Sequence, residues 1–207
     1  MIKAVREYLS FAGIQYRNPD KAGDEREKML ELRKKGQEAR KSFTELAKTF
    51  QANHPEWKLQ QTSQWMNQAQ RLRPHFWAYL QREGKVSEPM LALRLYGAPS
   101  DFGVSLEVSF IERKKDEQTL DKQSKILEIP VVEGMYYLAY TDGQSYRIEA
   151  TEENRLLLRE KMRSQEVRKV LVKSDVSFIA NQSVEAILEK LEDAYTRLLP
   201  YYEVTRG

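Results

Sequence analysis

Two carboxylates and a lysine near the middle of the chain have the spacing of a metal-dependent nuclease. Asp101, two residues after Pro99, is followed by Glu112 and Lys114, which completes a PD…ExK pattern. In enzymes of this kind, carboxylates hold a divalent metal ion and the lysine assists the attacking water. One hypothesis is therefore a metal-dependent phosphodiesterase or nuclease that uses Asp101, Glu107 or Glu112, and Lys114.

The strand expected between these residues argues against that hypothesis. Residues 104–111 alternate between apolar and polar types and contain no turn residue. Extended chain at ~3.3 Å per residue would hold Asp101 and Glu112 roughly 36 Å apart. Two carboxylates at that separation cannot bind one ion, so we expect residues 112–117 to form a charged strand end that enters solvent.

The other short motifs indicate neither a catalytic centre nor a cofactor. Asp101-Phe102-Gly103 matches the metal-binding triplet of protein kinases, but H-R-D and V-A-I-K are absent, and we predict a turn that enters a strand. The chain has no G-x-G-x-x-G, Walker A or G-x-S-x-G sequence. Its two histidines, His54 and His75, lack the spacing of a metal site. No metal and no cofactor are expected, and whether the protein is an enzyme stays open.

The composition narrows the chemistry further. The 207 residues include no cysteine, which excludes disulfides, thiolate catalysis and cysteine-ligated zinc or iron–sulfur sites. The N-terminal residues do not resemble a signal peptide, and no stretch approaches ~18 consecutive apolar residues. We therefore predict a cytoplasmic protein without membrane contact.

Positive charge and tryptophan concentrate in the N-terminal part. Residues 1–85 hold 17 Lys/Arg against 10 Asp/Glu, whereas residues 86–207 hold 17 against 21, so the net charges are +7 and −4. Basic side chains contact phosphates, and aromatic rings stack on bases. The favoured function is a non-enzymatic binding protein whose basic helical surface contacts nucleic acid or an acidic protein. The candidate nucleic-acid-binding residues are Lys34, Lys35, Arg40, Lys41, Arg71, Arg73, Trp77 and Arg82.

An ordinary solvated helix is the alternative interpretation of the same surface. Glutamates are interleaved with the lysines and arginines, and several fall four residues from a basic side chain. They are Glu27, Glu31, Glu38 and Glu45.

The elements that position these residues follow from hydrophobic spacing. Apolar residues three and four apart predict a long amphipathic helix over residues 25–50, with a kink at Gly36. A second helix is predicted to begin near Thr62 and to continue to about Leu80, with an interruption at Pro74. Trp65 and Phe76 are expected in the core.

The second half of the chain shows the alternation of strands. Strands are predicted near residues 91–95, 104–110, 135–141, 145–150 and 167–180, and Asp142-Gly143 predicts a hairpin turn. Arg94 points away from its leucine neighbours, and if that face is concave, Arg94 and Glu107 line it. Two helices are predicted, one capped by Thr151 and one from Ser183 to Pro200.

These elements predict an α+β fold, in which an N-terminal helical region packs on or beside a mainly antiparallel sheet with covering helices. The chain divides into a basic helical region, residues 1–85, and an α+β region, residues 86–207. The alternative is that both regions belong to one compact domain. A homo-oligomer paired through exposed helix faces is a further alternative.

Four segments in the middle of the chain have a recognisable sequence: residues 73–77, 88–97, 105–114 and 136–143. Together they resemble a small family of uncharacterised bacterial proteins. The resemblance implies a bacterial, cytoplasmic protein and no site residues. Some members bear the name glucose-6-phosphate dehydrogenase, but this chain lacks the glycine-rich dinucleotide turn and the length of such an enzyme.

Overall fold

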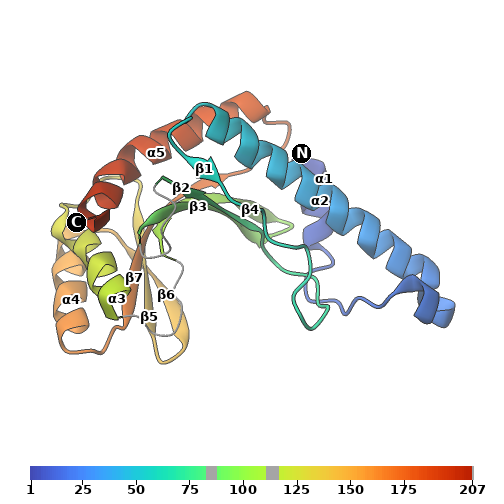
Figure 1. The fold of residues 1–207 in the computed structure, drawn as a ribbon, viewed down its shortest axis with the longest axis horizontal. Coiled ribbons are helices and arrows are strands. Elements are labelled where there is room, and N and C mark those ends of the chain that lie inside the picture. The colour runs from blue at the N-terminus through green and yellow to red at the C-terminus, as the bar shows by residue number, and fades with distance from the viewer. Residues whose placement is uncertain (83–87, 111–116, 207) are drawn as a thin grey trace.

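The computed structural model describes residues 1–82, 88–110 and 117–206. It confirms the predicted α+β class: seven strands form one antiparallel sheet, and helices pack along its outer side (Figure 1). The helices are α1 (Ile2–Leu9), α2 (Arg26–Ala52), α3 (Glu117–Ser124), α4 (Glu152–Arg163) and α5 (Val184–Arg206), with short 3-10 turns at Pro19–Lys21, Gly23–Glu25 and Lys125–Glu128. The strands are β1 (Lys58–Leu59), β2 (Trp77–Gln81), β3 (Met90–Ala98), β4 (Asp101–Ser109), β5 (Tyr136–Thr141), β6 (Gln144–Glu149) and β7 (Lys169–Ser177).

The sheet crosses the boundary between the two predicted regions. Its strand order is β1-β2-β3-β4-β7-β5-β6, and every neighbouring pair is antiparallel. Strands β1 and β2 come from the basic N-terminal part, yet they extend the same sheet that β3–β7 form. None of the helices in the described residues has an apolar stretch long enough to cross a lipid bilayer.

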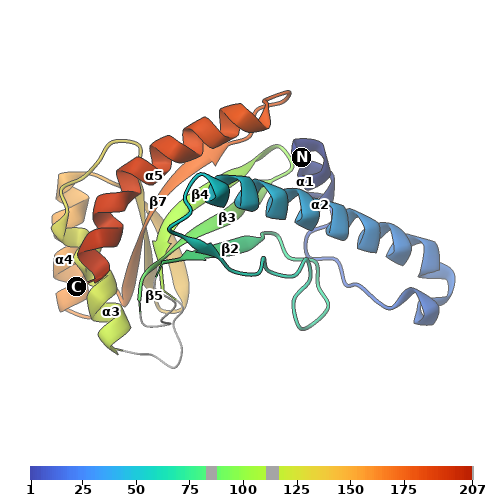
Figure 2. The same ribbon diagram turned by 45° about the horizontal axis from the view of Figure 1, so that its top comes forward.

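The two faces of the sheet differ because side chains alternate along each strand. One face carries Leu91, Leu93, Val104, Leu106 and Val172, all 0% exposed and packed in the main core. Helices α2 and α5 lie over that face, so the molecule has the shape of an arch with the sheet on its inner side (Figures 1 and 2). Burial of this apolar surface is the main source of stability.

Helix α2 confirms the predicted amphipathic helix but has no break at Gly36. The backbone stays helical from Arg26 to Ala52, and the Trp65 ring packs on Gly36. A Cβ atom at position 36 would lie 2.5 Å from Trp65 Cε3. The glycine therefore admits the tryptophan ring instead of bending the helix.

We expect Gly36→Ala to destabilise the protein, although alanine ordinarily favours a helix by about 1 kcal/mol over glycine. Overpacking against the Trp65 ring should cost about 1–2 kcal/mol, which urea denaturation would measure. The double variant with Trp65→Leu should lose much of this penalty. A more stable Gly36→Ala protein would contradict the close approach.

The predicted helix from Thr62 to Leu80 is wrong. Residues 60–76 form an irregular segment, and Trp77–Gln81 is strand β2. The hydroxyl of Tyr8 lies within hydrogen-bond distance of the backbone carbonyls of Trp65 and Arg73, which fixes this segment against α1. Tertiary contacts thus outweigh a helix-like apolar spacing that Pro74 already interrupts.

Helix α5 also extends further than predicted. The helix continues through Pro200 to Arg206, where the sequence predicted an end. A proline removes one backbone hydrogen bond, but the fully buried rings of Tyr201 and Tyr202 anchor the last turns in the core. The other predicted elements are confirmed, including the β5–β6 hairpin at Asp142-Gly143 and the Thr151 cap, whose side chain accepts a hydrogen bond from the Asn154 amide. Residues 169–177 form a single strand, β7.

Candidate functional site

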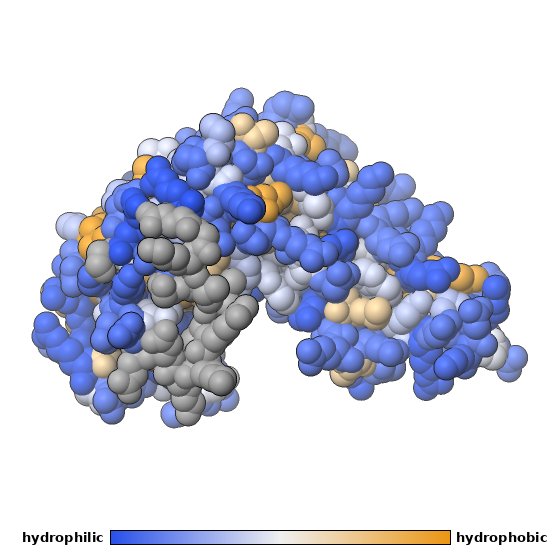
Figure 3. All heavy atoms as spheres, in the orientation of Figure 1, coloured by the Kyte–Doolittle hydropathy of each residue, from blue (hydrophilic) through white to orange (hydrophobic). Residues whose placement is uncertain are grey.

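The inner face of the sheet lies toward the hollow of the arch (Figure 3), and its register places charged and aromatic side chains together. Residues paired across antiparallel strands point to the same side, so the register places side chains from six strands on this face. We call it the concave face and define it by the following residues: Trp77 and Tyr79 on β2, Arg94 on β3, Glu107 on β4, Lys173 and Asp175 on β7, Tyr136 and Tyr140 on β5, and Arg147 on β6.

A buried carboxylate with two cations lies at the centre of the concave face. Glu107 is 0% exposed, and its two oxygens accept from Arg94 Nη2 and Lys173 Nζ, each at 2.9 Å. Burial alone would raise the pKa of Glu107, but the charges of Lys173 and Arg94 outweigh it and hold that pKa below its ordinary value. Glu107 is therefore the counterion of a structural cluster, which we call the triad.

The triad has more positive than negative charge. Two cations share one carboxylate, and the described residues supply no second anion to either cation. Burial lowers the pKa of the neighbouring His75, and the charges of Arg94, Arg73 and Lys173 lower it further, against the opposite effect of Glu107. The centre of the concave face therefore has a positive potential.

A second cluster lies on β5, β6 and β7. The Tyr136 hydroxyl donates to Asp175 Oδ1 at 2.9 Å, and Arg147 Nη1 contacts Asp175 Oδ2 at 2.7 Å. The Arg147 guanidinium lies over the Tyr136 ring, with Cζ 3.5 Å from the ring centroid. Further along the same two strands, Lys169 Nζ of β7 lies 4.7 Å from the centroid of the Tyr140 ring of β5. Cations and rings thus alternate across this part of the face.

Of the basic residues predicted to bind nucleic acid on α2, two are exposed and two contact other parts of the protein. Lys34 and Lys41 are exposed on the helix surface, whereas Lys35 forms an ion pair with Glu7 of α1. Arg40 donates to the backbone carbonyls of Ser63 and Thr62 at 2.9 and 3.0 Å. These two contacts show that Arg40 fastens the irregular segment to α2.

The remaining predicted contacts lie elsewhere. Arg71 donates to the Gly13 carbonyl at 3.2 Å, and Arg82 forms an ion pair with Glu203 at 2.8 Å. Arg73 and Trp77 come together with the triad: Arg73 Cζ and Arg94 Cζ lie 4.7 and 5.6 Å from the Trp77 ring centroid. Arg73 and Trp77 are thus the members of the predicted set that border the concave face.

Two carboxylates of the nuclease hypothesis, Asp101 and Glu107, lie far apart in the structure. Asp101 is exposed at the first residue of β4, and Glu107 is buried six residues further along the same strand, which separates them by roughly 20 Å. Glu112 and Lys114 lie outside the described residues. Within the part of the chain that the structure describes, no group of three histidine, aspartate or glutamate side chains can hold a metal ion.

The kinase-like triplet has a structural explanation. Asp101-Phe102-Gly103 already belongs to strand β4, where the sequence predicted a turn that enters the strand, and a Cβ atom on Gly103 would lie 2.2 Å from the backbone oxygen of Val176. Glycine is therefore required here for the close approach of β4 and β7. Phe102 is 2% exposed and packs on Phe178.

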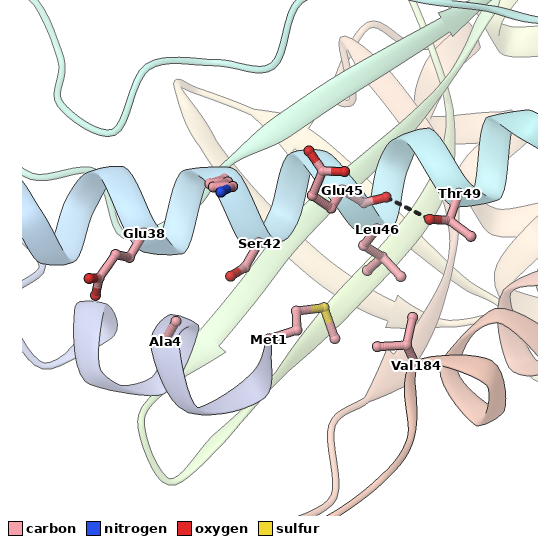
Figure 4. Close-up of a pocket in the computed structure, with 9 residues that line it drawn as sticks. Met1, Ala4, Glu38, Ser42, Glu45, Leu46, Thr49 and Val184 are labelled. Carbon is pink, nitrogen blue, oxygen red and sulfur yellow. Dashed lines mark hydrogen bonds between the residues drawn. The ribbon is translucent and has the colours of Figure 1, made fainter.

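A groove of about 490 Å³ lies away from this face, between α1, α2 and the start of α5 (Figure 4). Met1, Ala4, Leu46 and Val184 give it an apolar floor. Glu38, Glu45 and Lys41 also line it, but no aromatic ring does. The groove lacks the concentration of charge and rings that marks the concave face.

The sequence contained a signal for part of the site, since Arg94 and Glu107 interrupt apolar runs on the side opposite the leucines. Lys173, Tyr136, Tyr140, Arg147 and Asp175 were missed because strand order decides which residues meet. Comparison of the chain with known protein families and with curated proteins finds no match.

Proposed function

We propose that the protein is a binding protein that holds single-stranded nucleic acid on the concave face. The observation that carries the proposal is the triad, in which Arg94 and Lys173 share the single carboxylate of Glu107. A phosphate group supplies the missing negative charge. Because the triad is largely shielded from water, that attraction is stronger than at an exposed lysine.

The aromatic residues favour nucleic acid over other anions. Trp77, Tyr79, Tyr136 and Tyr140 lie on the same face as the cations. Uncovered sheets that recognise RNA use aromatic rings in this way, because unpaired bases stack on them while basic side chains follow the phosphates. A duplex offers no free base faces, so a single strand fits best. The proposal keeps Arg73 and Trp77 from the predicted contacts and moves the site from α2 to the sheet.

We expect a fluorescein-labelled oligouridine to bind in a strongly salt-dependent way. Contact with about four phosphates would give a slope of about −3 for log affinity against log salt, so affinity should fall about 50-fold from about 50 to about 200 mM salt. Fluorescence anisotropy measures both quantities. Absence of binding even at low salt would overturn the proposal.

Two variants with equal charge change locate the site. Arg147→Gln removes one cation at the concave face, and Lys34→Gln removes one exposed cation on α2. The concave-face variant should bind more weakly with a salt slope shallower by about 0.7, whereas the α2 variant should bind like the wild type. The reverse pattern would place the site on the helix. Equally tight binding of polyglutamate would indicate an acidic protein partner instead.

A further inference from the structure

The Tyr136 ring is held in a fixed position at the edge of the concave face. Its hydroxyl donates to Asp175, and the residue is 8% exposed. Directly across the ladder, Lys173 of the triad places Nζ 6.0 Å from the ring centroid. A flat group on this ring would therefore lie next to the excess positive charge.

The group that now covers the ring is itself flat and weakly held. The guanidinium of Arg147 lies 3.5 Å from the ring centroid, the separation of stacked planes. The Arg147 side chain is 62% exposed, while that of its partner Asp175 is 15% exposed, so the pair lies at the surface on the arginine side. Such ion pairs and cation–π contacts are individually weak at exposed sites, so Arg147 can leave the ring at little cost.

On the basis of the nucleic-acid function proposed above, we propose that Tyr136 and Arg147 form a nucleobase subsite. The base takes the position of the guanidinium on the Tyr136 ring, and Arg147 moves outward to a phosphate of the same strand. Asp175 keeps the ring in place through the tyrosine hydroxyl. The subsite stacks on any base, because every base has a planar face.

Photocrosslinking tests the subsite in the intact protein. An oligouridine that contains 5-iodouridine should crosslink to the aromatic ring on which the modified base stacks, and mass spectrometry of the peptides identifies the residue. We expect an adduct on Tyr136. An oligonucleotide that binds with adducts only on other residues would overturn the inference and leave the proposed function standing, whereas no binding would overturn both.

Variants separate the ring from the charge. Tyr136→Leu should lose the adduct and bind at least about 5-fold more weakly, with an unchanged salt slope. Arg147→Ala should keep the adduct, while its salt slope becomes shallower by about 0.7. Tyr136→Phe keeps the ring and loses only its hydrogen bond to Asp175, so it should keep the adduct and bind more tightly than Tyr136→Leu.

A matched control comes from the next strand. Tyr146 of β6 pairs with Ala139 and lies on the opposite side of the sheet, 48% exposed. Tyr146→Leu is the same chemical change away from the concave face, and it should alter neither crosslinking nor affinity. An equal loss of affinity in Tyr146→Leu and Tyr136→Leu would overturn the subsite.

Discussion

Replacement of Glu107 by glutamine should lower the free energy of unfolding by about 3–5 kcal/mol, which urea denaturation would measure. The substitution keeps the size of the side chain and removes its charge. Arg94 and Lys173 would then be two neighbouring cations without a counterion, with side chains only 25% and 6% exposed. Little water reaches these side chains in the free protein, so most of the cost of the unpaired charge remains.

A second carboxylate on the same face provides the control. Asp175→Asn breaks the ion pair with Arg147, but that arginine is 62% exposed and regains water, so the cost should be below about 1 kcal/mol. Adding Lys173→Met to Glu107→Gln should recover part of the lost stability, because one unpaired cation is removed. Equal stability of Glu107→Gln and the wild type would show that the triad is not a structural cluster.

The same triad predicts a dependence of stability on pH. The pKa of Glu107 is lower in the folded protein than its ordinary value of 4.5, because Lys173 and Arg94 outweigh the effect of burial. Its contribution to stability is therefore complete above pH 4.5 and is lost as the pH falls through the folded-state pKa. Melting curves of the wild type should show this loss, and the Glu107→Gln protein should show less of it.

The local elements of this fold were largely predictable from periodicity. The α2 helix and the β5–β6 hairpin were correct because their amphipathic spacing and turn chemistry agree with their environment. The segment around Trp65 was wrong because its apolar residues pack on α1 and α2 in an irregular path, which spacing alone cannot distinguish from a helix. The sequence predicted a helix end at Pro200, but the packing of Tyr201 and Tyr202 keeps the chain helical beyond it.

The site depended on information that the sequence does not contain. Arg94 and Glu107 were recognisable as partners on the polar side of adjacent strands, and the structure joins them in an ion pair. Lys173 lies 66 residues after Glu107 in the chain, and only the pairing of β4 with β7 places it on the same carboxylate. A basic composition located positive charge in the N-terminal region, but the positive potential of the concave face comes largely from β3 and β7.

Replacement of Lys173 by methionine should weaken oligouridine binding by about 10- to 100-fold and have a smaller effect on stability than Glu107→Gln. The methionine keeps the buried chain length, and Glu107 retains Arg94 as a counterion, so the remaining pair is neutral. The substitution removes the excess positive charge that we propose binds the phosphate. A hydrogen bond to a charged group contributes about 1.5–3 kcal/mol, which corresponds to the expected loss of affinity. Anisotropy with labelled oligouridine and urea denaturation measure the two effects separately.

His75 gives a readout of the same change that needs no ligand. Burial, Arg94, Arg73 and Lys173 together hold the pKa of His75 below its ordinary value of 6.5, so removal of one of these cations should raise that pKa. The chain has two histidines, and an NMR titration of their ring protons can follow His75 while the His54 resonance, which should be the same in both proteins, serves as the control. A raised His75 pKa with unchanged oligouridine affinity would show that Lys173 charges the concave face without binding phosphate. A raised His75 pKa together with weaker oligouridine binding would show that the positive charge at the centre of the sheet contributes to binding.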